Sequence, residues 1–141
     1  MIKAKHFAIH ELIPPKAYSR FGNRGWMLLD PSLIELVDAL RGRYVSATIN
    51  NYKWKGLEGA RQWSGLRTSD SPWYSPYSQH SFGRAADMIF RDISAEEVRQ
   101  DIIANPAEFL KISPSITLEE GVSWCHVDVR NGKYGINTFK P

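Results

Sequence analysis

Apolar residues at helical spacing give the clearest pattern in the chain. Four of them recur at intervals of three and four positions and therefore line one face of a helix: Leu33, Leu36, Val37 and Leu40. Asp30 and Pro31 precede this run, and an Asp N-cap followed by Pro in the first turn is a typical helix start. We predict a helix that begins at Pro31 and ends at Gly42.

Two other segments have the features of helices. Ser94 and Glu97 have the spacing of a capping box, and the apolar residues after them lie on one face, which predicts a helix that ends before Pro106. A short turn of helix is expected at 107–110. Near the N-terminus a short helix can begin at Pro15, where a missing N–H costs nothing.

Strands are predicted where apolar residues alternate with polar ones or run together. Four segments meet this criterion: 44–52, 85–90, 116–118 and 123–129. Residues 53–79 have no period and are rich in Gly, Ser, Pro, Trp and Tyr, and so long a loop in a small domain usually serves a function. The glycine-punctuated tail, 131–141, is expected to be irregular.

Composition narrows the class of protein. The chain has 141 residues, 43% hydrophobic and 23% charged, which suits one globular domain over 1–141. Cys125 is its single cysteine, so no internal disulfide can form. We find no run of ~20 apolar residues and no secretory signal, and expect a monomer made in the cytoplasm without membrane insertion. The net charge of +3 is scattered, which gives little support to nucleic-acid binding.

Candidate chemistry gathers around two histidines. His80 precedes Asp87 by seven residues, and His126 precedes Asp128 by two. Imidazole and carboxylate are good zinc donors, and a catalytic zinc takes three protein ligands and leaves a position for water. His126 and Asp128 share a face of their predicted strand, so Asp128 can hold the second nitrogen of a ligand imidazole. Spacing alone leaves open that His80 is a surface histidine and Asp87 a turn residue.

Three short motifs occur in order along the chain. Residues 64–68 read S-G-L-R-T, 78–87 read S-Q-H-S-F-G-R-A-A-D, and 124–126 read W-C-H. They resemble the S-G-x-R-[ST], S-x-H-x-x-G-x-A-x-D and W-x-H motifs of the M15 peptidases. These are zinc D-Ala-D-Ala carboxypeptidases and phage endolysins, related in fold to the Hedgehog signalling domain.

The resemblance implies a fold and a set of site residues. The fold would be α+β, a small antiparallel sheet with packed helices, of the Hedgehog and DD-peptidase type. His80, Asp87 and His126 would bind zinc, although manganese or cobalt can use the same donors. Arg67 would stabilise negative charge on the substrate carbonyl oxygen. The alternative role for Arg67 is a surface ion pair.

Residues just before the zinc signature are candidates for substrate binding. Tyr74 and Tyr77, with Trp73, would form the wall of a cleft, and Ser78 would contact the substrate. The alternatives are that the aromatic side chains only pack the loop and that Ser78 makes a turn hydrogen bond.

The general base departs from the family pattern. Carboxypeptidases of the family commonly have Glu three residues before the third ligand, where this chain has Ser123. Hedgehog-like relatives have it six residues before, at the position of Glu120. Six residues of straight strand span ~20 Å, so Glu120 requires a bend, which Gly121 allows. We predict Glu120 as the base, with Glu119 as its replacement.

The resemblance therefore implies a zinc-dependent peptidase that hydrolyses an amide bond in the peptide part of bacterial peptidoglycan. It does not choose between carboxypeptidase and endopeptidase. The small size and the expected lack of a signal are compatible with a phage or prophage product that reaches the cell wall after release or within a particle. The alternative is a non-catalytic zinc-binding structural or interaction module of the same fold.

Overall fold

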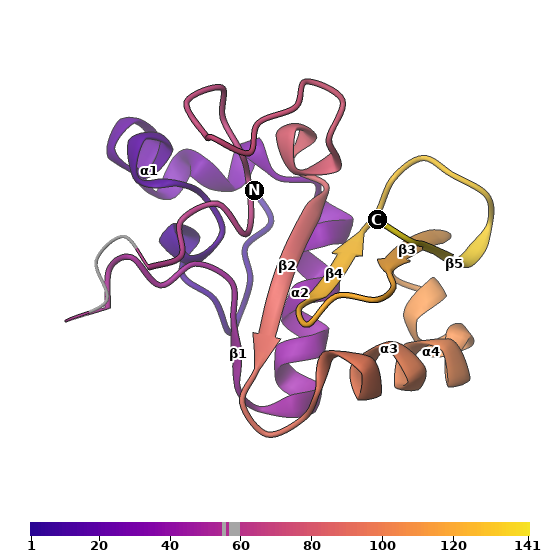
Figure 1. The fold of residues 1–141 in the computed structure, drawn as a ribbon. Helices are drawn as coiled ribbons and strands as arrows, with labels where there is room; N and C mark the ends of the chain where they lie inside the picture. Colours follow the sequence, from indigo (N-terminus) through magenta and orange to yellow (C-terminus); the bar gives the residue numbers. More distant parts are fainter. Residues whose placement is uncertain (55, 57–59) are drawn as a thin grey trace.

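The computed structural model describes residues 1–54, 56 and 60–141 (Figure 1). In these residues five strands form one sheet in the order β1-β2-β4-β3-β5. The strands are β1 (Ala47–Thr48), β2 (Ala85–Phe90), β3 (Ser115–Glu119), β4 (Cys125–Asp128) and β5 (Gly135–Phe139). The α-helices are α1 (Pro15–Phe21), α2 (Pro31–Tyr44), α3 (Ala95–Ala104) and α4 (Pro106–Leu110). Three 3-10 helices complete the set: η1 (Ile9–Glu11), η2 (Gly22–Leu28) and η3 (Gln79–Phe82).

The predicted α+β class is confirmed, but the sheet is mixed. β2 pairs antiparallel with β1 and β4, and β3 pairs antiparallel with β4. β5 runs parallel to β3 at the edge of the sheet, so the prediction of an irregular tail is wrong. The residues of β5 are mostly half-buried and do not alternate in burial, which explains why the sequence pattern gave no strand there.

The two faces of the sheet differ in polarity because successive side chains of a strand point to opposite sides. One face is buried against the helices, and α2 runs behind β2 in Figure 1. The inner strands place their apolar residues on this face: Ala86, Met88, Leu118, Cys125 and Val127. The alternate residues give the other face its polar groups: Asp87, Thr117, Glu119, His126 and Asp128.

The predicted long helix is present and extends further than expected. Asp30 caps α2 by accepting a hydrogen bond from the Ser32 backbone N–H at 2.8 Å. The helix continues through Gly42 to Tyr44, where the sequence predicted an end. Tertiary contact explains the extension, because Arg43 in this last turn donates to Asp101 of α3 at 2.6 Å and 3.1 Å.

The remaining predictions agree with the structure to different degrees. Ser94 is confirmed as the cap of α3, accepting from the Glu97 N–H at 3.1 Å. Of the predicted strand 44–52, only the two residues of β1 are in the sheet, and Tyr44 belongs to α2. Within the predicted loop 53–79, residues 55 and 57–59 lie outside the described residues, and the rest has neither helix nor strand before η3. None of the helices in the described part of the chain has the length and apolar character that a membrane span requires.

Candidate metal centre

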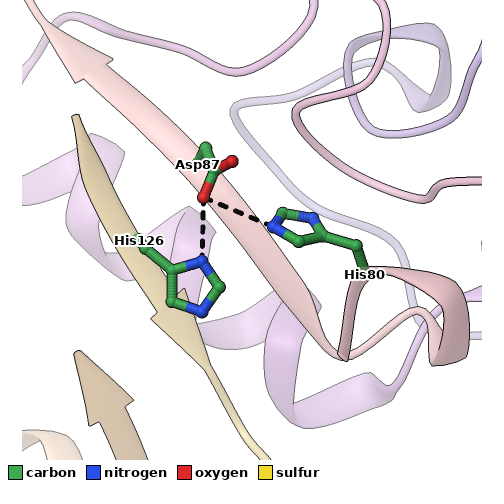
Figure 2. Close-up of side chains that lie close together, drawn as sticks. All are labelled: His80, Asp87 and His126. Carbon is green, nitrogen blue, oxygen red and sulfur yellow. Dashed lines mark hydrogen bonds and ion pairs between the residues drawn. The ribbon is translucent and has the colours of Figure 1, made fainter. Parts of the chain in front are cut away.

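Three predicted ligands meet on the polar face of the sheet (Figure 2). Asp87 on β2 and His126 on β4 are direct cross-strand partners. His80 reaches them from η3, which lies just before β2. All three residues are buried, and one potential ligand atom of each lies within 4.8 Å of the others. The group is therefore able to hold a metal ion.

Local structure fixes the approach of His80. Ser78 caps η3 by accepting a hydrogen bond from the His80 backbone N–H at 3.2 Å. Gly83 ends η3 in the left-handed region, with φ of 68°, and a Cβ there would lie 2.1 Å from the Leu28 carbonyl oxygen. Only glycine fits this turn, which carries the chain from His80 into β2.

The second nitrogen of each imidazole has a protein partner. His80 Nδ1 donates to the Gly65 carbonyl at 2.8 Å, which leaves Nε2 at 3.3 Å from Asp87 Oδ1. His126 Nε2 lies 2.9 Å from Asp128 Oδ2, and its Nδ1 lies 2.8 Å from Asp87 Oδ1. Partners of this kind orient metal-binding imidazoles. Asp128 thus lies where a group supporting the ligand His126 is needed.

The donor set fits a small divalent cation. Two donors about 2.0 Å from a tetrahedral zinc lie roughly 3.3 Å from each other. The distances of 3.3 Å and 2.8 Å from Asp87 Oδ1 to the two facing nitrogens are close to this value. Two nitrogens and one carboxylate oxygen leave room for a fourth, non-protein ligand. The residues therefore fit a three-ligand site of the kind that catalytic zinc uses.

Two arginines hold the carboxylates of the site. Arg67 Nη2 donates to Asp87 Oδ2 at 3.0 Å, while its Nε donates to the Trp63 carbonyl at 2.8 Å. Arg130 binds both oxygens of Asp128, with Nε at 2.7 Å from Oδ1 and Nη2 at 2.5 Å from Oδ2. Asp128 has no exposed surface, so Arg130 compensates a charge that water does not reach.

These contacts shift the acidity of the ligands. Burial favours the neutral form of Asp87, but its hydrogen bonds with His126 and His80 outweigh burial and hold its pKa well below the ordinary value. Burial lowers the pKa of His126, whereas hydrogen bonds with Asp128 and Asp87 raise it to about 9. To hold a metal ion through Nδ1, His126 would have to lose the proton on that nitrogen, so metal binding would release protons.

A cleft of about 710 Å³ opens over the three ligands. Among the other predicted site residues, Arg67, Tyr77 and Ser78 line it. Tyr74 instead lines a neighbouring cavity, which Arg67 also borders. Glu119 lines the cleft, whereas Glu120, the predicted base, is absent from the described residues that form its walls. The alternative for Ser78, a turn hydrogen bond, is also present as the η3 cap.

Sequence reasoning missed other residues that line the cleft. Arg130 lies two positions after Asp128, and this spacing could have indicated that it reaches the same carboxylate. Arg61 lies in the loop before Ser64, and no motif or period in the sequence indicated that it lines the cleft.

Comparison of the chain with protein-family models, with curated proteins and with solved structures finds no match.

Proposed function

We propose that this protein is a zinc-dependent peptidase acting on the peptide part of bacterial peptidoglycan. The observation that carries the proposal is the buried group His80, Asp87 and His126 at a cleft that Arg67 and Glu119 also line. The three motifs that resemble M15 peptidases support this reading, since their residues converge on one place. The mixed α+β fold is compatible with the Hedgehog and DD-peptidase type that the motifs imply.

The chemistry requires a Lewis acid, a base and a group that stabilises negative charge. Zinc bound by three protein ligands supplies polarisation of a carbonyl and brings the pKa of water toward ~7. The chain itself must hold the substrate, accept a proton from water and stabilise charge on the carbonyl oxygen. Of the residues that line the cleft, Glu119 can accept the proton and Arg67 can stabilise the charge on the carbonyl oxygen.

Glu119 is our assignment for the general base in place of Glu120. Thr117 pairs with Asp128 across β3 and β4, and Glu119 follows Thr117 by two residues on the same face. Its side chain therefore shares the face of His126 and lines the cleft. Glu120 continues the chain beyond β3, and its backbone N–H bonds the Phe139 carbonyl. No sharp bend is needed for Glu119 to reach the cleft.

Arg67 is held so that part of its guanidinium is available to a substrate. Among the described residues, only Trp63 and Asp87 accept hydrogen bonds from its guanidinium, through Nε and Nη2. Nη1 can donate to the substrate carbonyl oxygen as negative charge develops there. The link to Asp87 keeps this donor beside the metal ligands.

The substrate class rests on the motifs and the cleft. A volume of about 710 Å³ lies in the range of ligand sites and accommodates a short peptide. Tyr77 and Trp73, which also line the cleft, have exposed fractions of 85% and 68% and offer apolar surface to it. A phage or prophage origin agrees with this substrate, and the choice between carboxypeptidase and endopeptidase is left to experiment.

Metal content and turnover test the proposal together. Elemental analysis should find about one zinc per wild-type chain, and His80→Ala should lose it. On peptidoglycan fragments, Glu119→Gln should lower turnover at least ~100-fold without loss of zinc, because it removes a general base. Glu120→Gln is the matched control and should stay near wild type. If the wild type bound zinc and hydrolysed nothing, the non-catalytic zinc-binding module would be favoured. If the folded protein bound no zinc, both the peptidase and the zinc-binding module would be rejected.

A further inference from the structure

Three arginines line the cleft over the metal centre, and they differ in what balances their charge. Arg67 pairs with Asp87 at 3.0 Å, and Arg130 pairs with Asp128 at 2.5 Å. Arg61 has no carboxylate within ion-pair distance among residues 1–54, 56 and 60–141. Its Nε donates instead to the neutral carbonyl of Ile49 at 3.0 Å. Arg61 is therefore the cleft arginine whose charge lacks a partner in the described chain.

Arg61 is also fixed in position. Its hydrogen-bond acceptor, Ile49, is fully buried, and its own carbonyl accepts from the Asn51 N–H at 3.0 Å. Arg61 lines the same cleft as His80, Asp87 and His126, and burial lowers the pKa of its guanidinium. With Nε engaged, the two Nη atoms remain as a planar fork. A preoriented fork of this kind suits the two oxygens of a carboxylate.

The charges around the cleft point to an anionic ligand. The three arginines are equal in number to the three carboxylates of this region, those of Asp87, Asp128 and Glu119, so the formal charges sum to zero even though Arg61 has no ion pair with a described residue. A bound divalent cation would then leave two positive charges in excess. Such an excess in a partly closed cleft attracts negatively charged substrates.

We propose that Arg61 binds a carboxylate of the substrate beside the amide bond that is cleaved. This inference rests on the proposed peptidase function and narrows its substrate to a peptide with a free carboxylate near that bond. Two sources supply this chemistry: the C-terminal carboxylate of a residue to be released, and the carboxylate of an acidic residue within the peptide.

The experiment compares matched peptides and matched variants. The substrates are peptidoglycan stem peptides ending in D-Ala-D-Ala as the free acid or as the C-terminal amide, and stem peptides that contain D-glutamate or D-glutamine. Values of kcat/KM are measured for zinc-loaded wild type, Arg61→Gln and Arg61→Lys. Arg24→Gln is the control, since Arg24 is exposed and does not line the cleft.

Wild type should prefer one acidic peptide to its neutral counterpart by roughly 10- to 100-fold, the range for a hydrogen bond to a charged group. Arg61→Gln should abolish that preference, Arg61→Lys should retain part of it, and Arg24→Gln should leave it intact. The pair that responds identifies the source of the carboxylate. As a readout other than activity, calorimetry on zinc-loaded Glu119→Gln, with and without Arg61→Gln, should show the same loss in Kd for the acidic peptide.

The outcomes separate the two proposals. Wild type that hydrolyses none of the peptides counts against the peptidase itself. Active wild type without any acid preference, or with a preference that Arg61→Gln retains, overturns the role of Arg61 and leaves the peptidase standing. If Arg61→Gln does not fold, Arg61→Lys tests the inference instead, because lysine keeps the positive charge and lacks the two-pronged guanidinium. Unchanged discrimination by Arg61→Lys would then reject the inference.

Discussion

The two faces of the central sheet are built from the same strands, but one face packs into the hydrophobic core and the other carries the candidate metal site. On β4, Cys125 and Val127 pack into the core, whereas His126 and Asp128 face the candidate metal centre. On β2, Asp87 lies between the buried residues Ala86 and Met88. The period of two thus places the candidate ligands Asp87 and His126 next to core residues on their strands.

This arrangement gives the ligands a rigid support. Burial of the apolar alternates fixes the register of β2 against β4, because a slip of one residue would turn the whole apolar set outward. The same register places Asp87 opposite His126. Substitutions on the apolar face should therefore act on stability, and substitutions on the polar face should act on the metal.

The largest expected effect comes from the apolar face. Leu118 on β3 is fully buried, and Leu118→Ala should lower the free energy of unfolding by about 2–5 kcal/mol through lost burial and a cavity. Zinc bound per folded chain should not change, because the ligands belong to other strands. Urea unfolding and elemental analysis measure the two quantities.

Thr117→Ala is the neighbouring control on the polar face. It removes fewer apolar contacts and should cost about 1 kcal/mol. If both substitutions lowered the free energy of unfolding equally, the apolar face would not contribute more to stability than the polar face, which contradicts the comparison.

A smaller effect, confined to the metal, is expected from Asp128→Asn. Asp128 Oδ2 lies 2.9 Å from His126 Nε2, and loss of such a partner typically weakens metal binding 10- to 100-fold. Competition with a chelating dye measures this affinity. Asp92→Asn, at an exposed position, should leave it at the wild-type value. Wild-type affinity in Asp128→Asn would show that the contact does not support the ligand.

The sequence predicted the centre better than its surroundings, for physical reasons. His80, Asp87 and His126 lie within short motifs, and Asp128 follows His126 by two residues on one strand, so local geometry determines where their side chains point. The prediction of Glu120 as base could not take account of the exit of β3, because this exit depends on pairing with β5, which the sequence pattern did not indicate. Arg61 was missed because its place depends on a contact with Ile49 that no local pattern encodes.

The smallest expected effect comes from an ion pair between α2 and α3, two of the helices that pack on the apolar face of the sheet. Asp101 on α3 accepts hydrogen bonds from Arg43 and Tyr44 of α2, and these hold its pKa below the ordinary value. A lowered pKa in the folded state means that the stabilisation is present above the unfolded value of ~3.9 and is lost as pH falls through the folded value. Asp101→Asn should therefore cost about 1 kcal/mol near pH 7, and the difference from wild type should shrink below pH ~4.

Urea unfolding of both proteins across this pH range measures the difference, with zinc content recorded at neutral pH. Glu108→Gln is the matched control: Glu108 also accepts from Arg43, at 2.8 Å, but its side chain is 49% exposed, so it should cost less. A stability difference that does not depend on pH would rule out the ion pair as its cause. A fall in zinc content would show that the edge of the helical layer acts on the metal centre, and the separation of the two faces would not hold.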